Sequence, residues 1–519
     1  MSLTKTKSDP DRGKSVLQGA KWRAGAVWYF LAFAVMMIPG LVSLWLVAGY
    51  LGSDPFAYAP QWSDEIFHWH QVATFRLAGF QGGYYTVNEQ PAPFAMSHFY
   101  THGPVYPMLF GTLGRLAGWG LTSAPIMGAL LTSLALGIFV FLTRPDWKQL
   151  LLLGLMMLTF WPMHLYMATD MRLTFFVAIA IVLAGCFYRT ITDPRGASPL
   201  FLTAFGLLLV AATVSKLTWS FLFFPYLLHI RQRLRLTVIQ SCVISGALIL
   251  LGFGTHSQLA APYPNFASEL LQAFRFSFMQ GAVLLLEHAG MGLGDFFDRL
   301  QNPLWLMLRI QILVTIVCAG FLIRGKSNGQ ENVREGLVLM ANSGLIIVLA
   351  IFLYDIFGWR DFRLFAPPLL LASLIFVARR RFVMVALLLV GNLLVGPAFF
   401  EAYGERFSHR RYSGGQAKVE AFANEISSVV QYDTAGEGWE NTILIPKSFL
   451  FDPVLAGIPP GIGISWFEAS ARLGRVKSRY LLLDSQSRLQ LGHQPGLKYL
   501  KETSLGGLYV NRGTGPGSE

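Results

Sequence analysis

The sequence predicts a polytopic α-helical membrane protein of about eleven transmembrane helices, followed by a small extracytoplasmic C-terminal α/β domain. Of the 519 residues, 53% are hydrophobic and only 13% are charged, whereas a soluble globular protein is about 25% charged. Apolar runs approaching the roughly 20 residues that span a bilayer recur through most of the chain. From about residue 400 onward the chain is less apolar and contains turn signals. The composition therefore places most of the chain in a membrane.

The chain begins with a basic tail, residues 1–24, which we expect to lie in the cytoplasm. The first apolar run, residues 25–51, is too long for the apolar part of a signal peptide and lacks a clear cleavage site, so it predicts a retained anchor. Together with the later runs it defines a transmembrane domain over residues 25–400. The predicted spans are centred near residues 38, 132, 158, 180, 207, 223, 245, 314, 345, 371 and 391.

Lysines and arginines gather in alternate connections between these spans, as the positive-inside rule requires of cytoplasmic loops. With the N-terminus inside, most acids fall on the outside. The net charge of +12 thus indicates membrane orientation and not nucleic-acid binding, and we expect a bacterial cytoplasmic (inner) membrane. The basic inside loops cover residues 144–148, 189–195, 231–235, 324–334 and 379–381.

Two long outer loops result, residues 52–122 and 255–303. Within the first, the apolar run Gly103–Trp119 is interrupted by prolines and glycines. We expect it to lie along the membrane surface or to re-enter the membrane, because a full span there would reverse every later loop. Residues 401–519 predict the outer α/β domain, for which acceptor recognition is our hypothesis. Its expected helix is 418–431, and its expected strands are 442–446, 479–484 and 507–511.

Acidic residues stand at the outer ends of two apolar runs. Asp64 and Glu65 lie side by side just after the first span, in SDEIFHW. They either begin an amphipathic surface helix, whose N-terminus favours acids, or supply a carboxylate that takes a proton from a hydroxyl. Asp170, in YMATDMRLTFF, either caps the following helix or serves a site, since acids at the edge of a membrane bundle are often functional. The topology places Asp64 and Asp170 on the same side.

Cations stand at the outer ends of two other runs. Lys216 is the lone charge in LLLVAATVSKLTWSFLFFP, and Arg360 and Arg363 lie in GWRDFRLFAPP. Lys216 either extends to the interface or binds a phosphate group. The arginines either pair with neighbouring acids or make bidentate phosphate contacts.

Histidines cluster in the first outer loop, among them His68 and His102. Pairs spaced four apart could bind a metal on a helix, but His102 is followed by Gly-Pro, which argues against a helix there. We therefore expect these histidines to line an outer polar cavity, and we assign no metal site. The three cysteines lie within apolar runs and predict buried small side chains. No phosphate-binding loop or nucleophile elbow is present in the sequence, so nucleotide chemistry has no support.

Five segments, in this order and on one side of the membrane, resemble the GT-C class of integral membrane glycosyltransferases. That class includes protein O-mannosyltransferases, the aminoarabinose transferase of lipid A and related lipid-linked sugar transferases. The resemblance covers roughly residues 25–400, with the outer domain matching by architecture only. Leu364 stands where a tyrosine often follows the arginine, which leaves the choice between Arg360 and Arg363 open. The five segments are SDEIFHW, THGPVYPMLFGTLGRLAGWG, ATDMRLTFFVAIA, VSKLTWSFLFFP and WRDFRLFAPPLLL.

The resemblance implies transfer of a hexose or pentose, with inversion, from a polyprenyl phosphate or pyrophosphate to a hydroxyl of a glycan, lipid or protein acceptor. It implies that Asp64 is the general base, that Asp170 positions the acceptor or the base, and that Glu65 is secondary. Lys216 with Arg363 or Arg360 would neutralise the departing phosphate, while Tyr84 and Tyr85 would stack on sugar rings. The resemblance implies no certain cofactor. Because some members use a divalent metal and others do not, a divalent metal ion stays possible.

Two other functions remain open. A lipid or glycan transporter or flippase would also carry polar residues at loop edges, although internal repeats or mid-span charges would be expected of it. An O-antigen ligase or polymerase would rely on arginine and histidine in a large late outer loop, where this chain has His256, Arg275 and His288.

Overall fold

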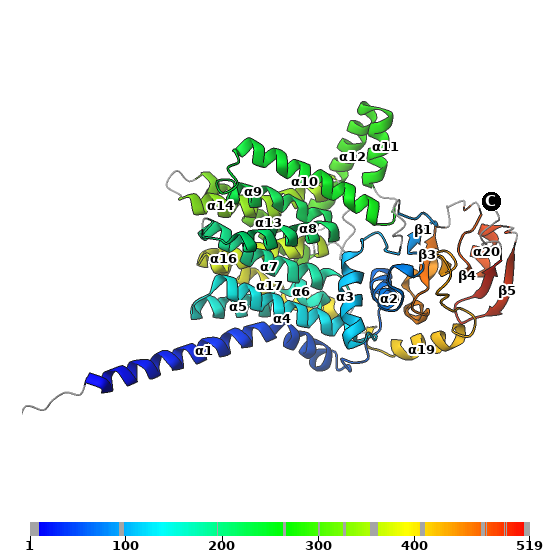
Figure 1. The fold of residues 1–519 in the computed structure, drawn as a ribbon, viewed down its shortest axis with the longest axis horizontal. Coiled ribbons are helices and arrows are strands. Elements are labelled where there is room, and N and C mark those ends of the chain that lie inside the picture. Colours follow the sequence, from blue (N-terminus) through cyan, green and yellow to red (C-terminus); the bar gives the residue numbers. More distant parts are fainter. Residues whose placement is uncertain are drawn as a thin grey trace, which may run out of the picture.

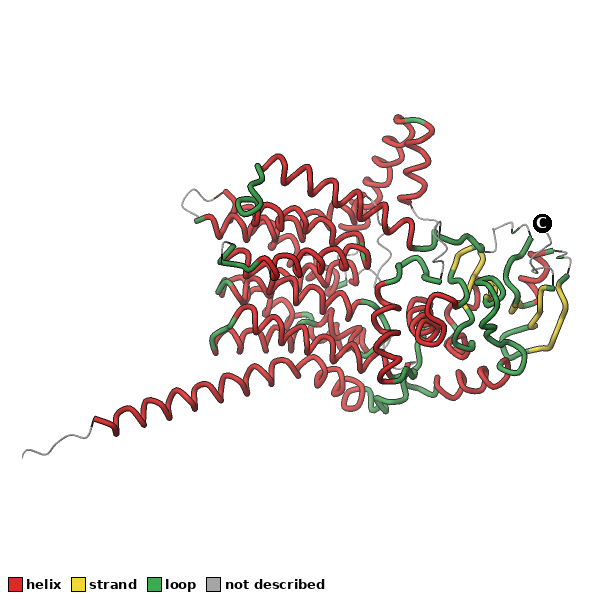
Figure 2. The backbone as a smooth tube through the Cα atoms, in the orientation of Figure 1, coloured by secondary structure: helices red, strands yellow, loops and turns green. Residues whose placement is uncertain are grey.

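The computed structural model contains a helical bundle with a mixed sheet packed at one end (Figure 1). Two regions are distinguished by their elements: the bundle is built from helices alone, and the strands are confined to the far end (Figure 2). The structure describes residues 10–92, 98–194, 196–262, 266–298, 302–324, 329–352, 362–404, 411–468, 473, 475–492, 494 and 496–512.

The bundle contains the helices that the hydropathy pattern predicts. Among the described residues, six helices are long and apolar enough to cross a membrane, or up to eight if each of two bent pairs is one span. Three shorter apolar helices accompany them, and every predicted centre falls within one of these elements. The polytopic helical fold is therefore confirmed, while the count of eleven crossings stays a prediction. The helices are α1 (Pro10–Trp45), α4 (Ser123–Thr143), α5 (Trp147–Thr159), α6 (Trp161–Met167), α7 (Leu173–Thr192), α8 (Pro199–Ser215), α9 (Phe223–Ile230), α10 (Val238–Leu259), α13 (Pro303–Arg324), α14 (Gln330–Leu339), α15 (Leu345–Phe352), α16 (Phe362–Ala378), α17 (Phe382–Leu394) and α18 (Gly396–Ala402).

Helix α7 is the centre of the bundle. It packs against α4 and α16, and nearly all of its side chains are buried, as expected for a helix that is apolar all round. Helix α10 is equally apolar but largely exposed. An exposed apolar helix of this length fits a lipid environment. The structure therefore distinguishes a protein-enclosed helix from a lipid-facing one where hydropathy alone does not.

The basic loops meet at one end of the bundle, which we call the basic end. Arg380 is ion-paired with Asp146 at 2.8 Å, and Arg334 donates to the carbonyl of Ile191 at 3.3 Å. These contacts join four of the predicted inside loops in two pairs. The opposite end, which we call the site end, lies beside the sheet (Figure 1). The shared side of the basic loops thus agrees with the predicted sidedness.

The outer loops are folded and contain helices of their own. Helices α2 (Ser63–Ala78) and α3 (Val105–Ala117) pack together across the site end. At about 1.5 Å per residue, α3 spans roughly 20 Å, too short for a hydrocarbon core of about 30 Å. This agrees with the prediction of a surface or re-entrant segment. The loop 255–303 contains α11 (Phe266–Phe276) and α12 (Phe278–Phe297).

The sheet has the order β1-β3-β2-β4-β6-β5. Strands β1 to β4 pair in parallel, and β6 pairs antiparallel with β4 and β5. The strands expected at 442–446, 479–484 and 507–511 are confirmed as β2, β4 and β6. The expected helix 418–431 overlaps α19, which begins and ends earlier. The elements are β1 (Thr86–Val87), α19 (Gly415–Ile426), β2 (Thr442–Pro446), β3 (Gly463–Phe467), β4 (Tyr480–Leu483), α20 (Ser485–Leu491), β5 (Leu497–Glu502) and β6 (Gly507–Asn511).

Strand β1 comes from the first outer loop and not from the C-terminal segment. Thr86 pairs with Ser465 and Val87 with Trp466, and the two hydroxyls of Thr86 and Ser465 lie 2.7 Å apart. The sheet domain is therefore completed by the loop that follows α2. This connection fixes α2 against the sheet.

Candidate active site

Helix α2 carries two acids in its first turn, Asp64 and Glu65. The N-terminus of a helix favours acids because it carries partial positive charge. Their side chains nevertheless have different partners: Asp64 is ion-paired with Arg363, and Glu65 with Arg411. The neighbouring acids therefore do not act on one group together.

Asp64 lies among the predicted cations. Arg363, in the first turn of α16, donates from Nη1 to Asp64 Oδ2 at 2.7 Å. Lys216, which follows α8, donates from Nζ to the backbone carbonyl of Arg363 at 3.5 Å. The structure thus brings together the expected base and two of the three expected phosphate-binding residues. Arg360 lies outside the described residues.

Asp64 and Arg363 remain partly open, with 27% and 25% of their side chains exposed. Burial alone would raise the pKa of Asp64, but the charge of Arg363 lowers this pKa well below its usual value. Asp64 is therefore ionised at neutral pH. It is a weak proton acceptor while Arg363 stays attached.

Asp170 lies between α6 and α7 and is 1% exposed. The Tyr106 hydroxyl donates to Asp170 Oδ1 at 2.5 Å, and the Asp170 N–H donates to the Tyr58 hydroxyl at 2.8 Å. Burial raises the pKa of Asp170 well above its usual value, and the bond from Tyr106 offsets only part of that rise. Asp170 is thus harder to ionise than an exposed aspartate, in contrast to Asp64.

His68, on the same helix as Asp64, lies against the backbone of Asp170. Its Nδ1 lies 3.3 Å from the backbone carbonyl oxygen of Asp170, an acceptor only, so Nδ1 carries the proton. Burial lowers the pKa of His68 well below its usual value, so the ring is neutral and Nε2 holds a lone pair. His68 Nε2 and Asp170 Oδ2 are buried with no hydrogen-bond partner among the described residues. Buried polar atoms of this kind need an explanation, and a bound substrate supplies one.

The His102 ring lies 5.4 Å from that of His68, so the structure brings together the two histidines expected to line the site. Burial, followed by the charge of Arg172, lowers the pKa of His102 to about 3. Both rings are therefore neutral at pH 7. Within the described ranges, no three His, Cys, Asp or Glu side chains are grouped in a way that would hold a metal ion.

Arg172 is a site residue that sequence reasoning did not single out. Its guanidinium is 5.1 Å from the centre of the Tyr106 ring, and it donates to the carbonyls of His102 at 2.7 Å and Gly103 at 3.3 Å. Arg172 thus holds the loop with His102 against the residues beside Asp170. The one local indication in the sequence that Arg172 belongs to the site is its position two residues after Asp170.

Glu65 is fully buried, and its carboxylate is already occupied. Arg411 Nε donates to both oxygens, at 2.9 and 3.0 Å, and the backbone N–H groups of Gln61 and Trp62 donate to Oε2 at 3.0 and 3.1 Å. The Arg411 guanidinium also lies 4.7 Å from the centre of the Trp62 ring. Glu65 therefore holds the start of α2, and the structure does not bring it to the Asp64 group.

The two tyrosines expected to line the substrate site lie elsewhere. Tyr85 is fully buried, where its hydroxyl lies 2.6 Å from His70 Nδ1 and donates to Thr74 at 2.8 Å. Tyr84 is half-buried against Trp439 of the sheet domain, with ring centres 4.9 Å apart. Both residues join the first outer loop to the sheet domain. They are placed there because β1 follows them directly and draws this part of the loop into the sheet.

The chain has a distant likeness to a solved structure. No protein-family model and no curated protein matches the chain. Among solved structures, the chain is similar to an Archaeoglobus fulgidus oligosaccharyltransferase, solved tethered through a disulfide bond to an acceptor peptide containing the NVT sequon. The identity is 11% and the TM-score 0.49, over 92% of this chain and 74% of that one. A likeness of this degree leaves the activity to be argued from the site.

Proposed function

We propose that this chain is a membrane glycosyltransferase of the GT-C type. It transfers a sugar from a polyprenyl phosphate or pyrophosphate to a hydroxyl acceptor, with Asp64 as the general base. The observation that supports this most is the group formed by Asp64, Arg363 and Lys216, an acid and two cations at the end of an apolar bundle. A lipid-linked donor needs a lipid-facing surface for its tail and cations for its phosphate.

The two cations suit the leaving group. When the anomeric carbon separates from the donor, the bonding electrons go to the phosphate oxygen, and its negative charge grows. Fixed cations stabilise such developing charge in the transition state, and an arginine can donate to two phosphate oxygens at once. Because Lys216 Nζ lies 3.5 Å from the backbone carbonyl of Arg363, we propose that the two side chains act on a single phosphate.

Arg363 is shared between Asp64 and the donor in this mechanism. A phosphate that attracts Arg363 weakens its hold on Asp64, and the pKa of Asp64 then rises because its main stabilising charge has moved. A carboxylate with a higher pKa accepts a proton more readily. Donor binding thereby raises the pKa of Asp64, so that the base becomes a good proton acceptor only when a sugar donor is bound.

The chemical step is a single displacement. The acceptor hydroxyl oxygen attacks the anomeric carbon, its proton passes to Asp64, and the bond to the phosphate oxygen breaks. Attack opposite to the leaving group inverts the anomeric centre. His68 Nε2, an acceptor without a described partner, is suited to orienting the hydroxyl, while Asp170 positions His68 through its backbone carbonyl.

The site is proposed to face the extracytoplasmic side. The basic loops lie at the opposite end of the bundle, and lysine and arginine favour the cytoplasm. A donor flipped to the outer leaflet would then meet acceptors of the cell envelope, whether glycan, lipid or protein. The bacterial cytoplasmic membrane is the proposed location.

The proposal is tested with purified protein in lipid vesicles and a panel of radiolabelled polyprenyl-phosphate and polyprenyl-pyrophosphate sugars, with candidate acceptors included. We expect one donor to lose its label with the wild type and Asp64→Asn to lower that rate by about 10²–10⁴-fold. Asp54→Asn is the matched control, since Asp54 is an exposed acid of the same loop whose carboxylate accepts a hydrogen bond from the nearby Phe56 N–H, which an asparagine carbonyl can also accept.

Each result of this experiment has a distinct meaning. Turnover that survives Asp64→Asn keeps the enzyme and rejects Asp64 as its base. Movement of intact labelled lipid across the vesicle membrane, without loss of label from the lipid, rejects the transferase and supports a flippase.

A further inference from the structure

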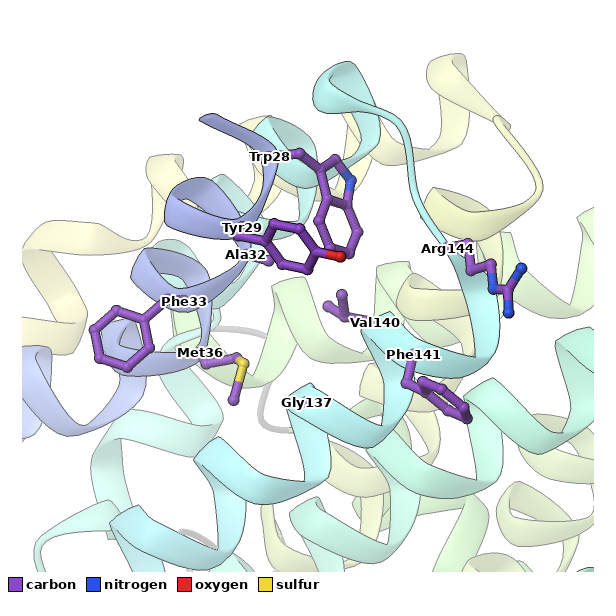
Figure 3. A pocket seen from close by; sticks show the side chains of 9 residues that line it. All are labelled: Trp28, Tyr29, Ala32, Phe33, Met36, Gly137, Val140, Phe141 and Arg144. Carbon is purple, nitrogen blue, oxygen red and sulfur yellow. The ribbon is translucent and has the colours of Figure 1, made fainter. Parts of the chain in front are cut away.

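A groove of about 590 Å³ lies between α1 and α4, away from the site. Figure 3 shows its wall, built from Trp28, Tyr29 and Phe33 on α1 and from Gly137 and Phe141 on α4. Arg144, the residue after α4, lies at one end of it. The groove is therefore apolar along its length and positively charged at one end.

The groove lies near the basic end of the bundle. Helices α4 and α7 run in the same direction, since Gly128 lies beside Thr174 and Gly185 beside Leu142. Asp170 precedes the start of α7, whereas Arg144 follows the end of α4. A helix the length of α7 spans about 30 Å. The groove is thus separated from Asp64 and Asp170 by most of the bundle, and the proposed transfer reaction does not use it.

The apolar wall is open to the surroundings. Tyr29, Phe33 and Phe141 are 71%, 61% and 70% exposed, which suits contact with acyl chains and not with water. Trp28 Nε1 donates to the carbonyl of Pro145 at 2.8 Å, so this tryptophan lies level with the residue after Arg144. Tryptophan and tyrosine are enriched where acyl chains meet headgroups.

Arg144 is an exposed cation at that level. Within the described ranges, no hydrogen bond or ion pair reaches its guanidinium, whereas nearby Arg380 is paired with Asp146 at 2.8 Å. Its φ is +46°, in the left-handed region where helix ends usually place glycine. A strained arginine in the place of glycine suggests a use for its side chain.

We propose that this groove binds a glycerophospholipid with an anionic headgroup, whose acyl chain lies between α1 and α4 and whose phosphate lies at Arg144. The eight-residue distance from Trp28 to Met36 is about 12 Å along a helix, close to the depth of one leaflet of a core about 30 Å thick. The charge of Arg144 complements the headgroup, and the exposed aromatic wall complements the chain. This proposal is independent of the transferase activity.

Native mass spectrometry of the full-length protein, titrated with phosphatidylglycerol or with phosphatidylcholine of the same acyl chains, tests it. We expect phosphatidylglycerol to bind the wild type about fivefold more tightly, as one cation near a headgroup provides. Arg144→Gln removes this preference. Lys148→Gln is the matched control, because Lys148 is an exposed cation in the first turn of α5, close to Arg144 in sequence, and lies over Trp147, 5.5 Å from the ring centre, outside the groove.

A second variant tests the apolar part. A side chain at Gly137 enters the groove beside Met36, whose flexible methyl end lies 2.9 Å from the position of the new Cβ atom. Gly137→Leu is therefore expected to weaken both lipids by a similar factor. Equal binding of the two lipids to the wild type overturns the proposal, as does an equal effect of Arg144→Gln and Lys148→Gln. A dimer that forms in place of lipid binding, and that Gly137→Leu dissociates, assigns the groove to a second copy of the chain instead.

Discussion

Arg411 donates from Nε to both carboxylate oxygens of Glu65, at 2.9 and 3.0 Å, across 346 residues of sequence. The exposed fractions of the two side chains are 2% and 0%. Next to it, the Tyr412 hydroxyl donates to the carbonyl of Ala168 at 2.7 Å. The segment that begins the sheet domain therefore holds both the residue beside Asp64 and the loop that precedes Asp170. The sheet domain is part of the framework of the site as well as a candidate for acceptor recognition.

Replacing one partner of this pair should be costly. Arg411→Met leaves Glu65 charged, buried and without its cation, so we expect the free energy of unfolding to fall by about 3–5 kcal/mol. Lys447→Met is the matched control in the same domain, because its partner Glu468 and Lys447 itself are 30% and 54% exposed. Exposed pairs contribute about 0–1 kcal/mol. Chemical unfolding in mixed micelles measures the free energy of unfolding of both variants. Equal losses would show that the buried ion pair contributes no more to stability than the exposed one.

The positions of the bundle helices follow from the sequence because lipid exposure leaves a hydropathy signal that does not depend on tertiary contacts. The positions of β2 and β6 also follow from the sequence, because their β-branched and aromatic residues are bounded by turn residues. Strand β1 has two residues, and its pairing with β3 depends on a segment almost 400 residues away. No local pattern reports such a pairing.

The site also has features that the sequence predicts and features that it does not. Asp64, Asp170, Lys216 and Arg363 could be named because each is a charge at the end of an apolar run, where charge is costly and therefore informative. The assignment of partners could not be predicted. Nothing near Glu65 indicates that it pairs with Arg411 while Asp64 pairs with Arg363, since both choices suit the first turn of a helix.

The pH dependence of turnover should report the Asp64–Arg363 pair. The base must be ionised, so kcat/KM falls as the pH drops through the pKa of Asp64 in the free enzyme. Because Arg363 lowers that pKa, the wild type should keep its activity to a more acidic pH than Arg363→Gln does. Arg363→Gln should also lose about 10²–10³-fold in kcat, since a donor to the leaving group is gone.

Arg363→Lys is the control for this prediction. A lysine keeps the positive charge beside Asp64, so the acidic fall in kcat/KM should stay near its wild-type position even if the rate is lower. An acidic limb that does not move in Arg363→Gln would mean that Asp64 is not the group that titrates.

Asp170→Asn should be milder than Asp64→Asn. Burial disfavours the ionised form of Asp170 by raising its pKa, and an asparagine carbonyl can accept the hydrogen bond from Tyr106 in place of Oδ1. We expect turnover to fall by no more than about fivefold, the weight of one ordinary hydrogen bond, against the much larger loss expected for Asp64→Asn. Parallel single-turnover assays of the two variants compare them. A loss for Asp170→Asn as large as that for Asp64→Asn would assign Asp170 an ionised role in the reaction.

The junction between α2 and the sheet domain should weaken in acid because of His70. This residue is fully buried, with Nε2 donating to the carbonyl of Ile458 at 2.8 Å and Nδ1 lying 2.6 Å from the Tyr85 hydroxyl. Burial lowers the pKa of His70 to about 4, below the value near 6.5 of an unfolded histidine. Between those two values the unfolded chain binds the extra proton. The contribution of neutral His70 to the free energy of unfolding is therefore fully present above about pH 6.5. It decreases by on the order of 3 kcal/mol as the pH falls to 4.

Unfolding measured from pH 4 to pH 8 checks this sign. His70→Gln has no ring to titrate, so its stability should decline less than that of the wild type between pH 6.5 and pH 4. Tyr85→Phe is the control, because it removes the hydroxyl at Nδ1 but keeps the histidine. It should lower stability at every pH while retaining the acid dependence. If His70→Gln and the wild type lose stability in parallel, protonation of other groups governs the acid response, and the pKa of His70 is the same in the folded and unfolded chains.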